Sequence, residues 1–290
     1  MRIYELGDGT PDVSVIGSIH GDEPCGARAI ERLVAEDPDV ERPVKFIIAN
    51  EEALDADVRY LDDDLNRAFP GDPNADSHER RLAHDLGREV RGTTAFSIHS
   101  TQSYADPFAI VDTVDAISRS ILPHLPVDVV VETNNFAEGR LIEHAHTVEV
   151  EAGLQKSDEA AKNAYWLIRA FLTATNVLPA PAVASDGGNG GGDGGGAGDS
   201  PVSKDDRLRL AAPEENSLDV YRLLEMIPKP AAKEYEVLAT NFEPVEGGQP
   251  FARADDETFV ADRDFYPVLL SAYGYADIFG YAGEKVGTLP

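Results

Sequence analysis

The chain has 290 residues, 42% of them hydrophobic, which suffices for a large globular core and excludes a wholly disordered protein. Its 53 acidic residues outnumber 25 lysines and arginines, a formal net charge of −28 that makes nucleic acids and anionic membranes poor partners. An acidic surplus spread along a chain of ordinary hydrophobicity is typical of proteins that work in molar salt, where charge repulsion is screened.

Features of membrane and secreted proteins are missing from the sequence. The longest apolar runs, such as 44–49 and 127–131, are too short to span a bilayer. Residues 1–6 lack the apolar segment of a signal peptide, and the single cysteine, Cys25, has no partner for an internal disulfide. We therefore expect a soluble, cytoplasmic protein.

Strands and helices alternate in the first part of the chain. In chain order the pattern predicts a strand at 13–20, a helix at 24–36, a strand at 44–49, a helix at 77–91, strands at 95–99, 127–132 and 147–151, and a helix at 157–175. Alternation of this kind favours an α/β fold with a mixed, mostly parallel sheet flanked by helices on both faces.

A glycine-rich segment divides the chain. Residues 185–200 read SDGGNGGGDGGGAGDS, which predicts a flexible linker or a long surface loop. After it come short β-like runs at 235–240, 258–261 and 265–270, separated by turn residues. We predict a first domain over 1–184, the linker or loop over 185–200, and a small β-rich domain over 201–290.

Residues of metal-binding type follow two of the predicted strands. His20 ends the first strand and Glu23 begins the next helix, so their side chains can converge on one point. His99 ends the strand at 95–99. Because ligands bind at the carboxyl ends of strands in open α/β sheets, we expect the three side chains to meet. Two imidazoles and one carboxylate are ligands that catalytic zinc uses. His144 and His146 are the alternatives.

Basic and amide side chains gather in the segment RYLDDDLNRAFPG at 59–71. Asp62 and Asp63 are expected to be solvated, as acidic runs usually are. The guanidinium groups of Arg59 and Arg67 can bind a carboxylate with paired hydrogen bonds or stabilise an oxyanion, and Asn66 lies beside them.

Two glutamates lie in the predicted strand VEVEAG. Glu149 and Glu151 point to the same face, so alternation cannot separate them. Glu151 is nearer to the end of the strand and precedes Gly153, which favours it as the group that projects into a cleft. A carboxylate beside a zinc site can act as a general base.

The segments GSIHGDEPCG, RYLDDDLNRAFPG, the strand ending in IHS, and VEAG occur in this order and together resemble the succinylglutamate desuccinylase/aspartoacylase family. That family is related to zinc carboxypeptidases. The resemblance implies one zinc ion per chain on His20, Glu23 and His99, with Glu151 as the catalytic carboxylate.

The resemblance also implies roles for the substrate-binding groups. Arg59 would polarise the scissile carbonyl, and Asn66 and Arg67 would hold a substrate carboxylate. A small β-rich C-terminal domain in the family partly covers the active site and can contribute a tyrosine. Tyr275 is the nearest match in this chain, and Tyr273 is a close rival.

The expected activity is zinc-dependent hydrolysis of the amide bond of an N-acyl amino acid or a similar small acylated substrate. Two alternatives stay open: a metallocarboxypeptidase that acts on short peptides, and a non-catalytic binding module on the same fold. The sequence leaves the acyl group, the amine and the oligomeric state undetermined.

Overall fold

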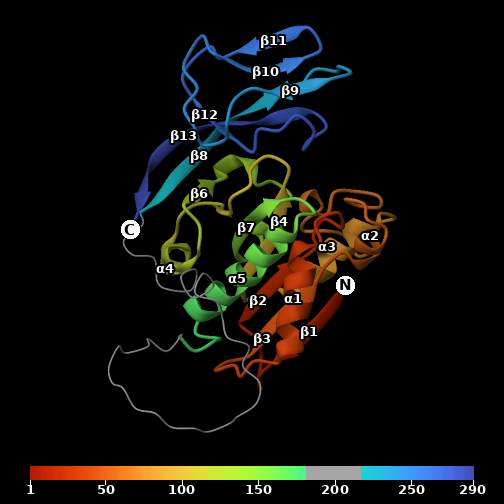
Figure 1. Cartoon of the computed structure of the whole chain (residues 1–290). Coiled ribbons are helices and arrows are strands. Elements are labelled where there is room, and N and C mark those ends of the chain that lie inside the picture. The colour runs from red at the N-terminus through yellow and green to blue at the C-terminus, as the bar shows by residue number, and fades with distance from the viewer. Residues whose placement is uncertain (181–216) are drawn as a thin grey trace.

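The computed structural model describes residues 1–180 and 217–290, coloured in Figure 1. The predicted linker at 185–200 lies outside the described residues, so the division into 1–184 and 201–290 stays a prediction. Among the described residues, no helix is both long enough and apolar enough to cross a membrane.

A large sheet of ten strands runs through the molecule (Figure 1). Its strands are β1 (Arg2–Leu6), β2 (Val13–Gly17), β3 (Val44–Ile48), β4 (Thr94–Thr101), β5 (Phe108–Val111), β6 (Val129–Glu132), β7 (His146–Leu154), β8 (Leu218–Pro228), β12 (Tyr266–Val268) and β13 (Ile278–Leu289). A second sheet holds β9 (Tyr235–Val237), β10 (Pro250–Ala254) and β11 (Glu257–Val260).

The helices are α1 (Cys25–Glu36), α2 (Glu51–Asp55), α3 (His78–Glu89), α4 (Ala116–Ile121) and α5 (Asp158–Ala174), with 3-10 turns η1 (Leu65–Arg67), η2 (Leu122–His124), η3 (Asn134–Phe136) and η4 (Leu141–Glu143). The helices predicted at 24–36, 77–91 and 157–175 correspond to α1, α3 and α5. Ser157 caps α5 by accepting a hydrogen bond from the backbone N–H of Ala160.

The strand order of the large sheet is β1-β3-β2-β4-β7-β5-β6-β8-β13-β12. β3, β2, β4 and β7 are parallel neighbours, as are β5, β6 and β8. Antiparallel pairs occur at β1–β3, β7–β5, β8–β13 and β13–β12. The sheet is therefore mixed, and the expectation of a mostly parallel sheet is not confirmed.

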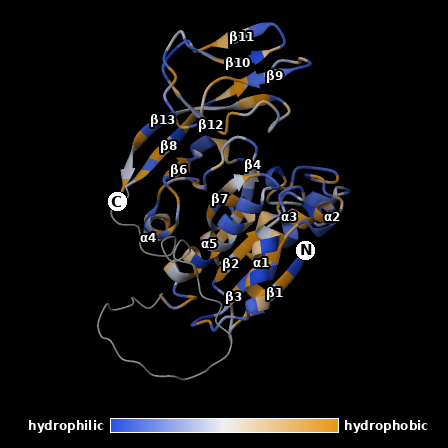
Figure 2. Cartoon of the chain, viewed as in Figure 1, coloured by the Kyte–Doolittle hydropathy of each residue, from blue (hydrophilic) through white to orange (hydrophobic). Residues whose placement is uncertain are grey.

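Both faces of the sheet are covered, which explains the unbroken apolar runs of the central strands. Val15 packs with α1 and α5 in one cluster, and Ile16 packs with α3 in another. The ring of Phe96 on β4 stacks on the ring of Phe171 on α5, with 4.5 Å between the ring centroids. Figure 2 shows hydrophobic residues along these strands. This packing holds the carboxyl ends of β2, β4 and β7 in fixed positions.

The strands after the glycine-rich segment extend the sheet. β8 pairs with β6, and β13 runs antiparallel to β8 along a long ribbon (Figure 1). The small β9–β10–β11 sheet packs on this ribbon through a cluster that includes Phe251, Phe265, Leu270 and Phe279. The predicted small β-rich C-terminal region is present, and it adds its strands β8, β13 and β12 to the large sheet.

Candidate active site

The loop that follows β2 carries the first two site residues. Ser18 adopts a positive φ of 53°, and the chain then turns through His20 and Gly21 before α1 begins. A Cβ on Gly21 would lie 2.1 Å from the backbone carbon of Ala53, so only glycine allows this loop to reach α2. The Gly21 N–H donates to the carbonyl of Arg59, which fixes the next segment beside the loop.

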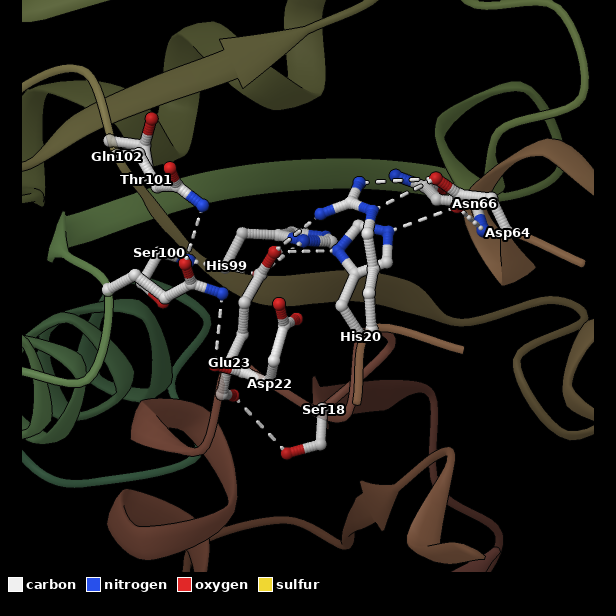
Figure 3. A network of polar contacts seen from close by, with 12 residues as sticks. Ser18, His20, Asp22, Glu23, Asp64, Asn66, His99, Ser100, Thr101 and Gln102 are labelled. Carbon is white, nitrogen blue, oxygen red and sulfur yellow. Dashed lines mark hydrogen bonds and ion pairs between the residues drawn. The ribbon is translucent and has the colours of Figure 1, made fainter. Parts of the chain in front are cut away.

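His20, Glu23 and His99 meet in a buried cluster (Figure 3). One ligand atom from each lies within 4.8 Å of the others. Nδ1 of His20 is 2.8 Å from Glu23 Oε1, and Nδ1 of His99 is 3.2 Å from Glu23 Oε2. The structure thus brings the predicted set together from the end of β2, the start of α1 and the end of β4.

The outer nitrogens of both rings have their own partners. Nε2 of His20 lies 3.1 Å from Asp64 Oδ1, and Nε2 of His99 lies 3.1 Å from the hydroxyl of Ser97. Both Nδ1 atoms therefore face Glu23, as rings that bind a metal through Nδ1 would. Two oriented imidazoles and a carboxylate fit a divalent transition metal such as zinc.

The charges in this cluster depend strongly on one another. Burial disfavours the charged imidazole of His99, but the hydrogen bond and charge of Glu23 raise the pKa of His99 to about 9. The pKa of Glu23 is lowered: burial acts to raise it, and the two histidines outweigh that effect. The carboxylate form of Glu23 and the protonated form of His99 thus stabilise each other, and a metal ion that replaced the proton on His99 would release it.

Arg59 and Asp64 form the next layer around the cluster. Arg59 donates from Nη1 to Glu23 Oε1 at 3.2 Å, and from Nε and Nη2 to Asp64 Oδ2 at 3.2 and 3.1 Å. Asp64 also accepts the backbone N–H of Asn66 at 2.9 Å. Asp64 therefore links His20, Arg59 and Asn66, although the sequence analysis assigned it no role.

Two arginines lie at one end of the site. Arg67 donates from Nη1 to the carbonyl of Asn66 at 2.7 Å, and the buried Arg140 donates from Nη2 to the hydroxyl of Tyr281 at 2.9 Å. Burial and the neighbouring Arg140 hold the pKa of Arg67 below its usual value. Arg140 was not predicted, because the turn that carries it has no recognisable pattern around it.

Glu149 and Glu151 share a face of β7, as alternation predicts. In the register of β7 on β4, Glu151 pairs with His99 and Glu149 with Ser97. Each glutamate has one buried carboxyl oxygen without a hydrogen-bond partner among the described residues. Burial and the charge of Glu23 raise the pKa of Glu151 to about 7. Glu151 is thus the glutamate level with the His20–Glu23–His99 cluster.

The His20–Glu23–His99 cluster, the three arginines and both glutamates of β7 line one inner cavity of about 60 Å³, whereas Asp64 lies behind this lining. The predicted site residues in its lining are His20, Glu23, Arg59, Asn66, Arg67, His99, Glu151 and Tyr275. The C-terminal region contributes Leu269, Ser271 and Gly274 as well as Tyr275. A single concave site therefore combines candidate metal ligands, a buried carboxylate and three guanidinium groups.

Comparison with known proteins agrees with this arrangement. Residues 9–114 match the family model described as the succinylglutamate desuccinylase/aspartoacylase catalytic domain. The resemblance to the succinylglutamate desuccinylase/aspartoacylase family is confirmed. The matched residues include His20, Glu23, Arg59, Asn66 and His99.

Solved structures of similar fold cover nearly the whole chain. A succinylglutamate desuccinylase/aspartoacylase from Rhodobacter sphaeroides has a TM-score of 0.70 at 18% identity, covering 98% of this chain and 89% of its own. The product-bound ectoine utilization protein EutE (DoeB) from Ruegeria pomeroyi has a TM-score of 0.68 at 18% identity, covering 97% of this chain and 88% of its own. Murine aminoacylase 3 has a TM-score of 0.65 at 19% identity, covering 98% of both chains. These likenesses show the desuccinylase/aspartoacylase fold, a mixed α/β sheet with a small β-rich C-terminal region.

The structure also places the rival residues. Tyr275 lines the inner cavity, whereas Tyr273 does not and is 63% exposed. His144 and His146, the alternative ligands, line another cavity of about 490 Å³ at the start of β7 and do not join the His20 cluster.

We predict that Asp64 orients His20 for metal binding. Asp64→Asn should weaken binding of added Zn²⁺ by about 10- to 100-fold, since the amide no longer holds His20 as a carboxylate does. Asp63→Asn is the matched control, because the Asp63 side chain is 44% exposed and pairs with Arg80 at 3.1 Å, away from the cluster. Competition with a chelator gives both affinities; equal affinities in the two variants would show that Asp64 does not orient the ligand.

Glu79 of α3 fixes the segment that carries Asp64. Its buried carboxylate accepts the backbone N–H groups of Leu61, Asp62 and Asp63 at 2.7, 3.0 and 3.1 Å, and the side-chain amide of Asn50 at 3.1 Å. Burial acts to raise the pKa of Glu79, but these hydrogen bonds hold it below its ordinary value. Sequence reasoning missed Glu79 because its partners lie more than 15 residues away.

Glu79→Gln should lower the free energy of unfolding by about 2–3 kcal/mol at pH 7, because an amide cannot accept three N–H groups. A carboxyl group with a lowered folded pKa stabilises the protein above its unfolded pKa of about 4.3 and loses that effect as the pH falls. The difference from wild type should therefore shrink between pH 6 and pH 4. Urea denaturation at both pH values tests this, with exposed Glu31→Gln as the control; a pH-independent difference would contradict it.

Proposed function

We propose that this protein is a zinc-dependent amidohydrolase that removes the acyl group from a small N-acyl amino acid. One observation carries the proposal: the buried His20–Glu23–His99 cluster shares its cavity with guanidinium groups and with a carboxyl oxygen of Glu151 that has no hydrogen-bond partner in the described part of the chain. Deacylation needs each of these parts, and the family match supports the same reaction class.

His20, Glu23 and His99 would hold one zinc ion. When bound, zinc polarises the carbonyl of a substrate and acidifies water. The three protein ligands leave a coordination position open, as in catalytic zinc sites. Arg59 already donates to Glu23 and Asp64, which keeps its guanidinium beside the cluster, where it would stabilise the negative charge that develops on the carbonyl oxygen.

Glu151 would accept a proton from the attacking water and pass it to the leaving amine. Its position level with His99 and its buried oxygen without a partner among the described residues support this role. Burial raises the pKa of Glu151 to about 7, so the carboxyl group can both accept a proton and give it back near neutral pH.

Asn66, Arg67 and Arg140 would bind the carboxylates of the amino acid. Two guanidinium groups in one cavity suit a substrate with two carboxylates, such as an acylated acidic amino acid. The side chain of Asn66 accepts the backbone N–H of Leu141 at 3.0 Å, which ties the Arg67 turn to the Arg140 turn.

Arg67→Lys should raise KM for an N-acyl acidic amino acid by about 10- to 100-fold with a smaller change in kcat, because an ammonium cannot form the paired hydrogen bonds of a guanidinium. Steady-state kinetics of Arg67→Lys and Arg140→Lys measure this effect, and exposed Arg88→Lys is the control. Unchanged KM in both site variants would assign these arginines to structure alone.

The proposed function is tested by screening purified full-length protein against N-acyl amino acids, with a chelator and then with added zinc. The screen should be run at molar salt, because adaptation to high salt remains a prediction of the composition. We expect zinc-dependent release of free amino acid. Zinc binding without cleavage of any N-acyl amino acid would contradict the proposal.

The same screen separates the two alternatives. Cleavage of short peptides in preference to N-acyl amino acids would favour a metallocarboxypeptidase, and binding without turnover would favour a non-catalytic module. The small inner cavity and the residues that the C-terminal region adds to its lining support a small substrate. A cytoplasmic location stays a prediction.

A further inference from the structure

A second cavity adjoins the inner one. It has a volume of about 410 Å³ and shares Gln102 and Ser271 with the lining of the inner cavity. We infer that it is an acyl subsite, which accepts an uncharged acyl chain longer than acetyl. The inference rests on the proposed deacylase function and adds a substrate class to it. We call this space the outer cavity.

The outer cavity lies toward the end of the site opposite the carboxylate-binding groups. Figure 3 shows Asn66 on one side of His20, Glu23 and His99, and Gln102 on the other side. A substrate whose amino-acid carboxylate lies near Asn66 and whose carbonyl lies at the cluster directs its acyl chain toward Gln102. The inner cavity, at about 60 Å³, has room for only a short acyl group.

Asn241 lies in the wall of the outer cavity, where the loop after β4 meets the C-terminal region. This buried side chain donates from Nδ2 to the carbonyl groups of Ser103 and Leu270 at 2.9 and 3.1 Å, and its Oδ1 accepts the N–H of Leu270 at 2.7 Å. It thus ties the loop after β4 to the C-terminal region. Gln102 on that loop donates to Gln155 at 3.0 Å, which positions it at the junction of the cavities.

The lining of the outer cavity determines what it can bind. None of the described residues that line it is charged: they are Gln102, Ser103, Val237, Ala239, Thr240, Asn241, Leu270, Ser271, Ala272 and Tyr273. A terminal carboxylate, as in a succinyl group, would lose water there without meeting a cation in the lining, because the Lys229 ammonium beside the cavity is bound to the carbonyl of Ala272 at 3.1 Å. Methylene groups gain from contact with the apolar members, by about fourfold in binding for each one fully buried.

The test uses acyl derivatives of the amino acid that the functional screen selects. Acetyl, butanoyl, hexanoyl and succinyl derivatives are compared as substrates of the zinc-loaded full-length protein. We expect kcat/KM for hexanoyl to exceed that for acetyl by at least tenfold, and succinyl to fall below butanoyl. A preference for succinyl, or no dependence on chain length, would overturn the inference.

Thr240→Trp tests the location of the subsite. Thr240 is exposed and lines the outer cavity, so an indole there should fill the cavity without disturbing the core. The hexanoyl-to-acetyl ratio should fall at least tenfold. Leu238→Trp is the matched control, because Leu238 is 37% exposed and lies outside the lining. Ala272→Leu is a second, smaller obstruction, and melting temperatures check folding.

The outcomes separate the two proposals. Cleavage of the acetyl substrate with no response of the ratio to Thr240→Trp or Ala272→Leu would overturn the acyl subsite and leave the deacylase function standing. The same loss in Leu238→Trp as in Thr240→Trp would also overturn it. If no acylated amino acid is cleaved, both proposals fail.

Discussion

Glu151→Gln is expected to reduce kcat by about 10²–10⁴, the range for loss of a general base, while the protein stays folded and keeps its zinc. Glu151 lies beside His99 in the register of β7 on β4, and one of its carboxyl oxygens is buried without a partner among the described residues. Glutamine has the same size and cannot accept and return the proton. The measurements are kcat, zinc content and melting temperature.

Glu149→Gln is the matched control on the same strand and face. Glu149 lies beside Ser97, one pair of residues deeper, and is 3% exposed. Its replacement should leave most of the turnover, or lower turnover together with the melting temperature. A folded, zinc-loaded and inactive Glu149→Gln would move the general-base role to Glu149. Full activity in both variants would require another proton acceptor.

Loss of a ligand from the His20–Glu23–His99 cluster should have the second large effect. His20→Ala or Glu23→Gln removes one of three protein ligands and should weaken zinc binding by more than 100-fold, beyond the 10- to 100-fold typical of changes to outer partners. Elemental analysis of the purified variants and chelator competition measure the effect. Activity should fall in parallel with zinc content.

His146→Ala is the control for the metal site. His146 is exposed, lies in the cavity at the start of β7 and was the alternative ligand together with His144. Its replacement should leave zinc content unchanged. Near-stoichiometric zinc in His20→Ala and Glu23→Gln, combined with loss in His146→Ala, would place the metal in that other cavity.

The sequence by itself determined the alternating strands and helices and the residues at their ends. Periodicity reports burial directly, so β2, β4, β7 and α5 were predicted close to their observed bounds. His20 and Glu23 are three residues apart in one turn, and His99 ends an apolar strand. Local spacing and the rule that ligands bind at carboxyl strand ends were therefore sufficient to predict the cluster.

The pairing of several strands in the large sheet was decided only by the tertiary structure. β1 and β5 are short, and β8 and β13 belong to the part that the pattern assigned to a separate domain. Whether such strands pair parallel or antiparallel depends on neighbours distant in sequence. Local propensity does not carry that information, which is why the mixed character of the sheet was underestimated.

The same reason explains the site residues that the sequence did not reveal. Arg140 and Asp64 carry no local signal. Arg140 lines the cavity, and Asp64 lies behind the lining, where it contacts His20 and Arg59. Alternation could not separate Glu149 from Glu151, and the distinction arose from pairing of β7 with β4. Residue type and spacing are local properties of the chain. Long-range packing determines which groups face one another across a cavity. Only the tertiary structure contains that information.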